Sequence, residues 1–137
     1  MIVQTQTTSF KAEVYQAVHN LLTNTIKIAL YTASANLDED TTVYSTTNEV
    51  VASGYTAGGA VMTGVTLNTS GYTVYVNFAN VSWSTSVTAR CALIYNASKS
   101  NKSIAVLDFG SDKTSTTTFT ITMPANTTTS ALIRSSN

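Results

Sequence analysis

The spacing of apolar residues changes once along the chain, near residue 25. Before that point, apolar positions recur every three or four residues, which is the period of a helix with one buried face. These positions are Phe10, Val14, Ala17, Val18 and Leu21. With Ser9 as N-cap and Asn24 as stop signal, the pattern predicts one helix over about Ser9 to Leu22. We favour packing of this helix on its own domain over docking on a neighbour.

After residue 25 the apolar positions alternate with period 2, as in strands with one buried face. Ile26–Tyr31 is the first predicted strand, and six more runs follow at short spacing, separated by turn residues. The runs are Ala60–Leu67, Tyr72–Phe78 continuing to Trp83, Val87–Tyr95, Ser103–Phe109, Thr117–Met123 and Ala131–Arg134. This spacing predicts a mainly β fold, a single antiparallel β-sandwich or barrel, immunoglobulin-like or jelly-roll-like, with one N-terminal α-helix.

Three details refine this prediction. Val81 and Trp83 have the opposite parity to the preceding strand, so we expect a bend near Ala79–Asn80 and a buried Trp83. The runs 87–95 and 104–109 are apolar at both parities, which predicts a central hairpin covered on both faces. The polar segment 32–59 is predicted to be a loop, with a short helical turn near residues 40–44.

Length and composition limit the kind of protein. The chain has 137 residues and a mass of 14.5 kDa, so we expect a single domain over residues 1–137. Residues 1–24 form its N-terminal arm and helix, and residues 25–134 its antiparallel β part. About 30% of the residues are Ser or Thr, and only 10% are charged. Such side chains suit a half-wet sheet face and supply few groups that transfer protons or bind metals.

Charge and the first residues bear on partners and location. Seven basic and seven acidic residues give a formal net charge of zero, so we expect neither nucleic acid nor a membrane as partner. The opening residues 1–5 lack a basic or apolar signal region, and no apolar run approaches the length of a membrane span. We therefore expect synthesis in a cytoplasm without secretion.

Residue types that usually carry catalysis are scarce. His19 is the only histidine and falls on the predicted surface helix, while Cys91, the only cysteine, lies in a strand-like run that predicts burial. Asp38, Glu39 and Asp40 lack the ligand spacing of a calcium loop, so a solvated acidic turn is favoured. We predict no catalytic residues, no metal site and no cofactor, and hence a protein that is not an enzyme.

Two glycine-containing motifs have alternative interpretations. Asp108-Phe-Gly110 matches the metal-binding tripeptide of protein kinases, but no other kinase motif accompanies it, so a strand end with a positive-φ glycine is favoured. Residues 54–59 lack the Gly-Lys-Ser/Thr sequence of a phosphate loop, which favours a close-packed loop. Within this loop, Tyr55, Gly58 and Gly59 are our candidates for contacts with a partner protein.

Aromatic residues allow one further alternative, a face that stacks on sugars. The residues concerned are Tyr44, Tyr55, Tyr72, Tyr75 and Trp83. Their spacing does not bring them to one face, so positions in the core and at the rim of the sheet are favoured.

Five segments carry a resemblance to a known family. They are Ile26-Lys-Ile-Ala-Leu-Tyr31, Thr41-Thr-Val-Tyr-Ser-Thr-Thr-Asn-Glu-Val50, the glycine-rich residues 54–59, Ala89-Arg-Cys-Ala-Leu-Ile-Tyr95 and Ala105-Val-Leu-Asp-Phe-Gly110. Over about residues 26–123 the chain resembles small structural virion proteins of tailed bacteriophages, of the capsid decoration or cement type or associated with the tail. The resemblance implies a β-sandwich without catalytic or cofactor residues.

The resemblance also implies a function and a location. We expect a capsid decoration or cement protein that binds and stabilises the assembled shell, with the major capsid protein or other virion proteins as partners. It would be a homo-oligomer, located in the virion after synthesis in the host cytoplasm. The alternatives are a tail, neck or fibre component and a carbohydrate-binding module.

Overall fold

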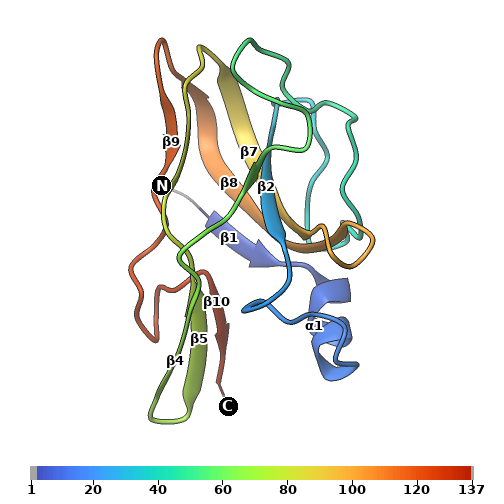
Figure 1. Cartoon of the computed structure of the whole chain (residues 1–137), viewed down its shortest axis with the longest axis vertical. Helices are drawn as coiled ribbons and strands as arrows, with labels where there is room; N and C mark the ends of the chain where they lie inside the picture. Colours follow the sequence, from blue (N-terminus) through green and yellow to red (C-terminus); the bar gives the residue numbers. More distant parts are fainter. Residues whose placement is uncertain (1–2, 137) are drawn as a thin grey trace.

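The computed structural model describes residues 3–136, and its largest element is a five-stranded antiparallel sheet (Figure 1). The domain expected from the sequence spans residues 1–137, and of these residues 1, 2 and 137 lie outside the described range. In spatial order the strands are β1 (Val3–Gln6), β8 (Lys102–Thr114), β7 (Thr88–Asn96), β2 (Ile26–Tyr31) and β3 (Ala60–Val61). The predicted central hairpin is confirmed, because β7 pairs with β8 in the middle of the sheet.

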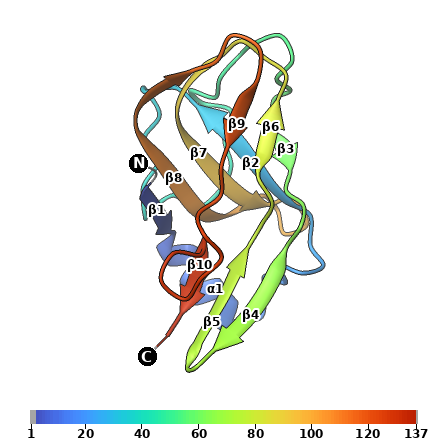
Figure 2. The ribbon, with the colours of Figure 1, turned by 90° about the vertical axis from the view of Figure 1, so that its left-hand side faces the viewer.

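Two smaller antiparallel sheets form the second layer (Figure 2). One, which we call the small sheet, has the order β10 (Ile133–Ser135), β5 (Thr73–Asn77) and β4 (Thr66–Ser70), and the other pairs β6 (Val81–Trp83) with β9 (Phe119–Ile121). The predicted bend is confirmed: the chain leaves the small sheet after β5 and enters the other sheet at β6. The fold is mainly β, antiparallel and sandwich-like, with one helix near its N-terminus.

The layers enclose an apolar core. Its fully or nearly fully buried members include Ile28, Leu30, Ile94, Ile104, Leu107, Phe109, Trp83, Phe119 and Ile121. Trp83 is buried as predicted, with its ring centroid 6.3 Å from that of Phe119. The outer face of the five-stranded sheet is also buried, under segment 32–59, and this explains why β7 and β8 are apolar at both parities.

Strand β1 was not predicted. Its sequence, Val-Gln-Thr-Gln, contains one apolar residue and therefore gives no alternating signal. It forms because the exposed edge of β8 offers backbone partners from Ala105 to Asp108, which pair with residues 6 to 3. Residues 3–6 of the N-terminal arm are thus part of the main sheet.

Helix α1 (Thr8–Tyr15) is shorter than predicted and starts elsewhere. The N-cap is Thr7, not Ser9: its buried hydroxyl accepts a hydrogen bond from the Phe10 amide. The helix ends at Tyr15, not Leu22, because Ala17 takes the left-handed conformation with φ of 59°. The amides of Ala17 and Val18 then bond back to the carbonyls of Val14 and Glu13, which is a Schellman motif. Phe10 anchors the helix in the core of its own domain.

Other boundaries also differ from the prediction. Segment 32–59 has no helical turn at residues 40–44; Val43 instead forms a bridge with Lys102. The run 60–67 is divided between β3 and β4, which lie in different sheets. Asp108-Phe-Gly110 is not a strand end, because β8 continues to Thr114 beyond a bulge, although Gly110 has the predicted positive φ of 81°.

Candidate functional site

The three residues predicted to contact a partner lie against the sheet. Tyr55 is buried, and its hydroxyl donates to Glu49 Oε2 at 2.6 Å and accepts from the Leu30 amide at 2.9 Å. Gly58 is buried, and Gly59 approaches β2 so closely that a Cβ on it would lie 1.8 Å from the Ile28 carbonyl oxygen. These contacts give the loop an internal role, and contact with a partner remains a prediction.

Glu49 organises the polar contacts under this loop and was not singled out from the sequence. Its buried carboxylate accepts hydrogen bonds from the hydroxyls of Tyr44 and Tyr55, both at 2.6 Å, and from the Gly58 amide at 2.8 Å. The Tyr95 hydroxyl donates to the Gly58 carbonyl at 2.6 Å, and the Tyr95 ring stacks on Tyr44. Its three partners lie five, six and nine residues away within segment 32–59, at spacings that match neither a helical nor a strand pattern, so no local pattern marks Glu49.

The tyrosines of this cluster are held in the protonated form. Burial, followed by the Glu49 carboxylate, raises the pKa of Tyr95 to about 12. The pKa values of Tyr31, Tyr44 and Tyr55 are raised as well, in each case chiefly by burial and next by Glu49. Tyr55 bonds to the Leu30 amide on β2, and Tyr95 on β7 bonds to the Gly58 carbonyl, so the cluster fastens segment 32–59 to the five-stranded sheet. We call this region the covered face.

His19 is placed differently from the prediction. It lies beyond the end of α1, and its side chain is only 1% exposed. Its Nε2 lies 2.9 Å from Glu13 Oε1, and its Nδ1 accepts from Asn96 Nδ2 at 3.1 Å. Through these two contacts His19 connects the segment after α1 to the helix and to β7.

The remaining candidate groups for chemistry lie apart. Asp38, Glu39 and Asp40 are exposed, and within residues 3–136 no group of three or more His, Cys, Asp or Glu side chains could hold a metal ion. Cys91 is buried, as predicted, and burial is the main cause that raises its thiol pKa to about 11. A thiol of that pKa is not a nucleophile near neutral pH.

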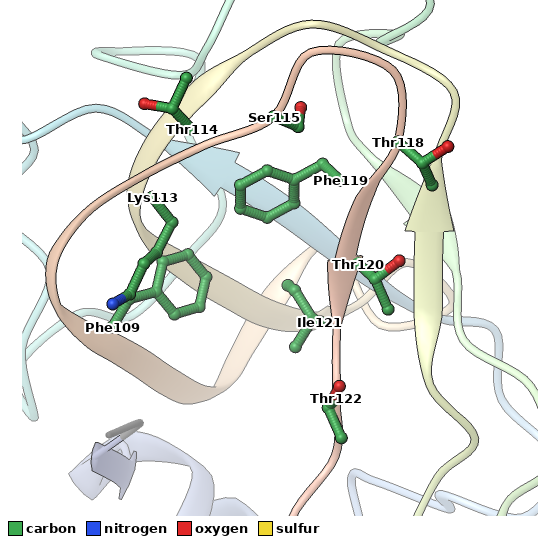
Figure 3. A pocket seen from close by; sticks show the side chains of 9 residues that line it. All are labelled: Phe109, Lys113, Thr114, Ser115, Thr118, Phe119, Thr120, Ile121 and Thr122. Atoms are coloured by element: carbon green, nitrogen blue, oxygen red, sulfur yellow. The ribbon is translucent and has the colours of Figure 1, made fainter.

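A pocket of about 370 Å³ opens between the end of β8 and β9 (Figure 3). Phe109 and Phe119 lie at its floor, and four threonines surround it: Thr114, Thr118, Thr120 and Thr122. Both rings are nearly completely buried, so neither presents a free face to a sugar. The aromatic residues considered for sugar binding are also dispersed: Tyr72 is exposed at a hairpin tip, whereas Tyr55 and Trp83 pack together in the interior.

A larger groove lies between the small sheet on one side and α1 with the segment after it on the other. Both sides project from the same end of the molecule (Figure 1). Its volume is about 910 Å³. Val14 and Leu22 on the helical side, and Leu67 and Val74 on the sheet side, line it and are 40–51% exposed. Such a set of half-exposed apolar side chains facing one groove is typical of a protein interaction site.

The chain was compared with family models, curated proteins and solved structures, and none of them matched. In the part of the chain that the structure describes, no helix has the length and apolar character needed to cross a membrane.

The sheet wall of the groove follows from strand alternation. Val74 and Val76 lie on one face of β5, and their cross-strand neighbours Leu67, on β4, and Ile133, on β10, extend that apolar face. Val76 and Ile133 are buried, whereas Leu67, opposite Val76 on the edge strand β4, and Val74, nearer the hairpin tip, are half exposed. The outer half of the apolar face remains open to solvent.

Polar contacts hold both walls in place. Gln4 donates from Nε2 to the carbonyls of Ser130 and Ala131, both at 2.9 Å, and Gln6 to that of Arg134 at 3.3 Å, which connects β1 to the small sheet. On the other wall, Glu13 contacts His19 and lies 3.4 Å from the Lys102 ammonium. The groove is therefore preformed by contacts that do not themselves fill it.

Proposed function

We propose that this protein is a non-enzymatic structural protein that binds a neighbouring protein in the groove between α1 and the small sheet. The observation that carries the proposal is the half-exposed apolar set on both walls, Val14 and Leu22 facing Leu67 and Val74. The charged residues along the lining that reach solvent are Lys11 and Arg134, both cations. A partner segment with apolar side chains and a carboxylate fits such a lining.

The resemblance to small virion proteins of tailed bacteriophages gives the context of the proposal. In that context the partner is the major capsid protein or another virion protein, and the protein acts as a capsid decoration or cement protein. Its mechanism is mass action: a protein that binds the assembled shell but not loose subunits stabilises the shell. Each half-exposed Val or Leu that becomes buried contributes on the order of 1 kcal/mol to that binding.

Particle binding with groove variants tests the proposal. We would combine Val14→Ser and Val74→Ser, one substitution on each wall, and measure binding to purified particles that lack the protein. We expect binding to weaken by about tenfold or more, because two apolar contacts are lost. Val51→Ser is the matched control, since Val51 is 98% exposed and does not line the groove.

Two results would contradict different parts of the proposal. If the double variant binds particles as tightly as the wild type, the groove is not the binding site. If the wild type neither binds nor copurifies with particles, the virion assignment is wrong. A copy number of one, or one third, per major capsid protein supports decoration, whereas a few per cent moves the protein to the tail, neck or fibre.

A further inference from the structure

Strand β4 forms an edge of the small sheet that nothing covers among residues 3–136 (Figure 2). It pairs only with β5, through all five residues from Thr66 to Ser70. Its sequence, Thr-Leu-Asn-Thr-Ser, contains no charge and no proline. Natural proteins usually protect an exposed edge with a charge, a proline, a bulge or a covering segment, because an open edge pairs with other strands.

The opposite edge of the same sheet is protected. There the side chains of Gln4 and Gln6 donate to backbone carbonyls at Ser130, Ala131 and Arg134, on and just before β10. These glutamines take the place of a neighbouring strand. At β4 the corresponding protection is limited to one end, where Asn126 Nδ2 donates to the Thr66 hydroxyl. The two edges of the small sheet thus differ in protection: glutamine side chains bond to backbone carbonyls at the β10 edge, whereas the β4 edge has the one contact at the Thr66 hydroxyl.

The hairpin fixes which backbone groups point outward from β4. Only Gly71 and Tyr72 separate the facing residues Ser70 and Thr73, and in a two-residue hairpin this closing pair is hydrogen-bonded. Alternation then directs the amide and carbonyl groups of Leu67 and Thr69 away from β5. Between them lies Asn68, whose side chain is on the sheet face opposite the groove.

We propose that β4 pairs antiparallel with β4 of a second copy of this chain, about a two-fold axis at Asn68. Around that axis, Leu67 of each copy lies opposite Thr69 of the other, and both residues present outward backbone groups, so the two pairs exchange four hydrogen bonds. Asn68 of one copy lies opposite Asn68 of the other, so a charged residue at this position would meet a like charge. The neutral sequence of β4 therefore suits self-pairing in particular.

The pairing joins two small sheets into one of six strands. Opposite residues in an antiparallel pair point to the same side, so the apolar faces of both copies lie on one side of the joined sheet. This inference concerns the backbone edge and goes beyond the proposed function, which concerns the groove; a dimer of this geometry would present two grooves to neighbouring partners.

Charge substitutions on the two-fold axis test the pairing by analytical ultracentrifugation of the whole chain. Asn68→Lys and Asn68→Asp should each weaken the dimer by about fivefold or more, since like charges then face each other across the strands. An equimolar mixture of the two variants should restore dimers, because the charges are then opposite. Ser135→Lys is the control, since it puts the same charge on the far edge of the same sheet.

A second measurement does not depend on the variants. Amide hydrogen exchange of the wild type should slow at Leu67 and Thr69 as the protein concentration rises. A chain that stays monomeric up to about 0.5 mM overturns the inference, as does an Asn68→Lys variant that dimerises like the wild type. An equal loss of dimer in Ser135→Lys also overturns it. Because Asn68 points away from the groove, these results leave the test of the proposed function independent.

Discussion

Two sheet faces in this protein are built from similar residues but differ in how far they are buried. On the covered face, the tyrosines and apolar residues of β2 and β7 lie under segment 32–59, and the Glu49 carboxylate satisfies the donors there. On the groove face of the small sheet, Leu67 and Val74 remain half exposed. The two faces share a β-rich character and differ in what lies over them.

The difference shows how a half-exposed apolar face arises in a chain with little charge. Covering the outer face of β7 requires a long segment with a buried carboxylate and closely approaching glycines. Over the small sheet, the corresponding cover would come from α1, but the Schellman motif at Ala17 ends the helix after eight residues. Apolar area that the chain leaves uncovered is available to another protein.

A glycine pair should show the contrast most strongly. Gly59→Ala places a Cβ 1.8 Å from the Ile28 carbonyl oxygen at a φ of 79°, so we expect a loss of about 4 kcal/mol or more, or no folding. Gly71→Ala, at a φ of 58° with nothing within 4 Å, should cost only about 1 kcal/mol. Urea unfolding of both variants provides the measurement, and equal losses would contradict the assignment of a closed and an open region.

The carboxylate of the covered face is the next largest contributor. Glu49→Ala leaves two buried donors and one partly buried donor without an acceptor, and we expect the free energy of unfolding to fall by about 3 kcal/mol. Glu39→Ala, in the exposed acidic turn, should change it by less than about 0.5 kcal/mol. If chemical denaturation shows the two variants to be equally stable, the Glu49 cluster does not fasten the loop.

Alkaline pH should weaken the covered face through its tyrosines. Below pH 10 the phenols are protonated in both the folded and the unfolded state. As pH rises from 10 toward 12, the unfolded chain loses the Tyr95 proton while the folded protein keeps it. The free energy of unfolding therefore falls with pH, by up to about 1.4 kcal/mol per pH unit for each such tyrosine.

Substitutions locate this pH dependence. Tyr95→Phe should reduce the slope of unfolding free energy against pH between 10 and 12, whereas Tyr72→Phe, at the exposed hairpin tip, should leave it unchanged. Denaturant unfolding at a series of pH values gives both slopes. An unaltered slope in Tyr95→Phe would show that its burial does not couple to stability.

The smallest expected effect concerns the end of α1. Ala17→Gly should stabilise the protein by about 1 kcal/mol, since glycine adopts a φ of 59° without the strain of a Cβ. Ala12→Gly, inside the same helix, should destabilise it by about 0.5–1 kcal/mol. Thermal unfolding of the pair tests this, and effects of the same sign would argue against a left-handed helix end at Ala17.

Prediction from the sequence succeeded where local patterns reflect final contacts. The alternation of β2 and β5 and the runs apolar at both parities in the β7–β8 hairpin gave correct strands, and the change of parity after Phe78 located the bend into β6. The helix boundary failed because Ala17, Val18 and Leu21 keep the helical period after the helix has ended. Apolar spacing identifies a buried face but does not register a backbone reversal made by hydrogen bonds.

The candidate site shows the same limit. Tyr55, Gly58 and Gly59 were selected as candidates for partner contacts in a loop expected to be close-packed; the structure shows which strand the loop packs on, β2, and the partner contact stays a prediction. Leu67 and Val74 belong to regular alternating runs, which predict an inward face whether or not anything covers it. The groove was therefore not predicted.

The sequence by itself determined the mainly β class, most of the strands, the central hairpin, the buried Trp83 and the scarcity of catalytic groups, because each depends on residue type or local period. The tertiary structure decided the pairing of β1, the cover over β7 held by Glu49, and the groove between α1 and the small sheet. The physical reason is sequence separation: the Gln4 side chain bonds to the carbonyl of Ser130, and Asn96 bonds to His19, across spans that no local pattern connects.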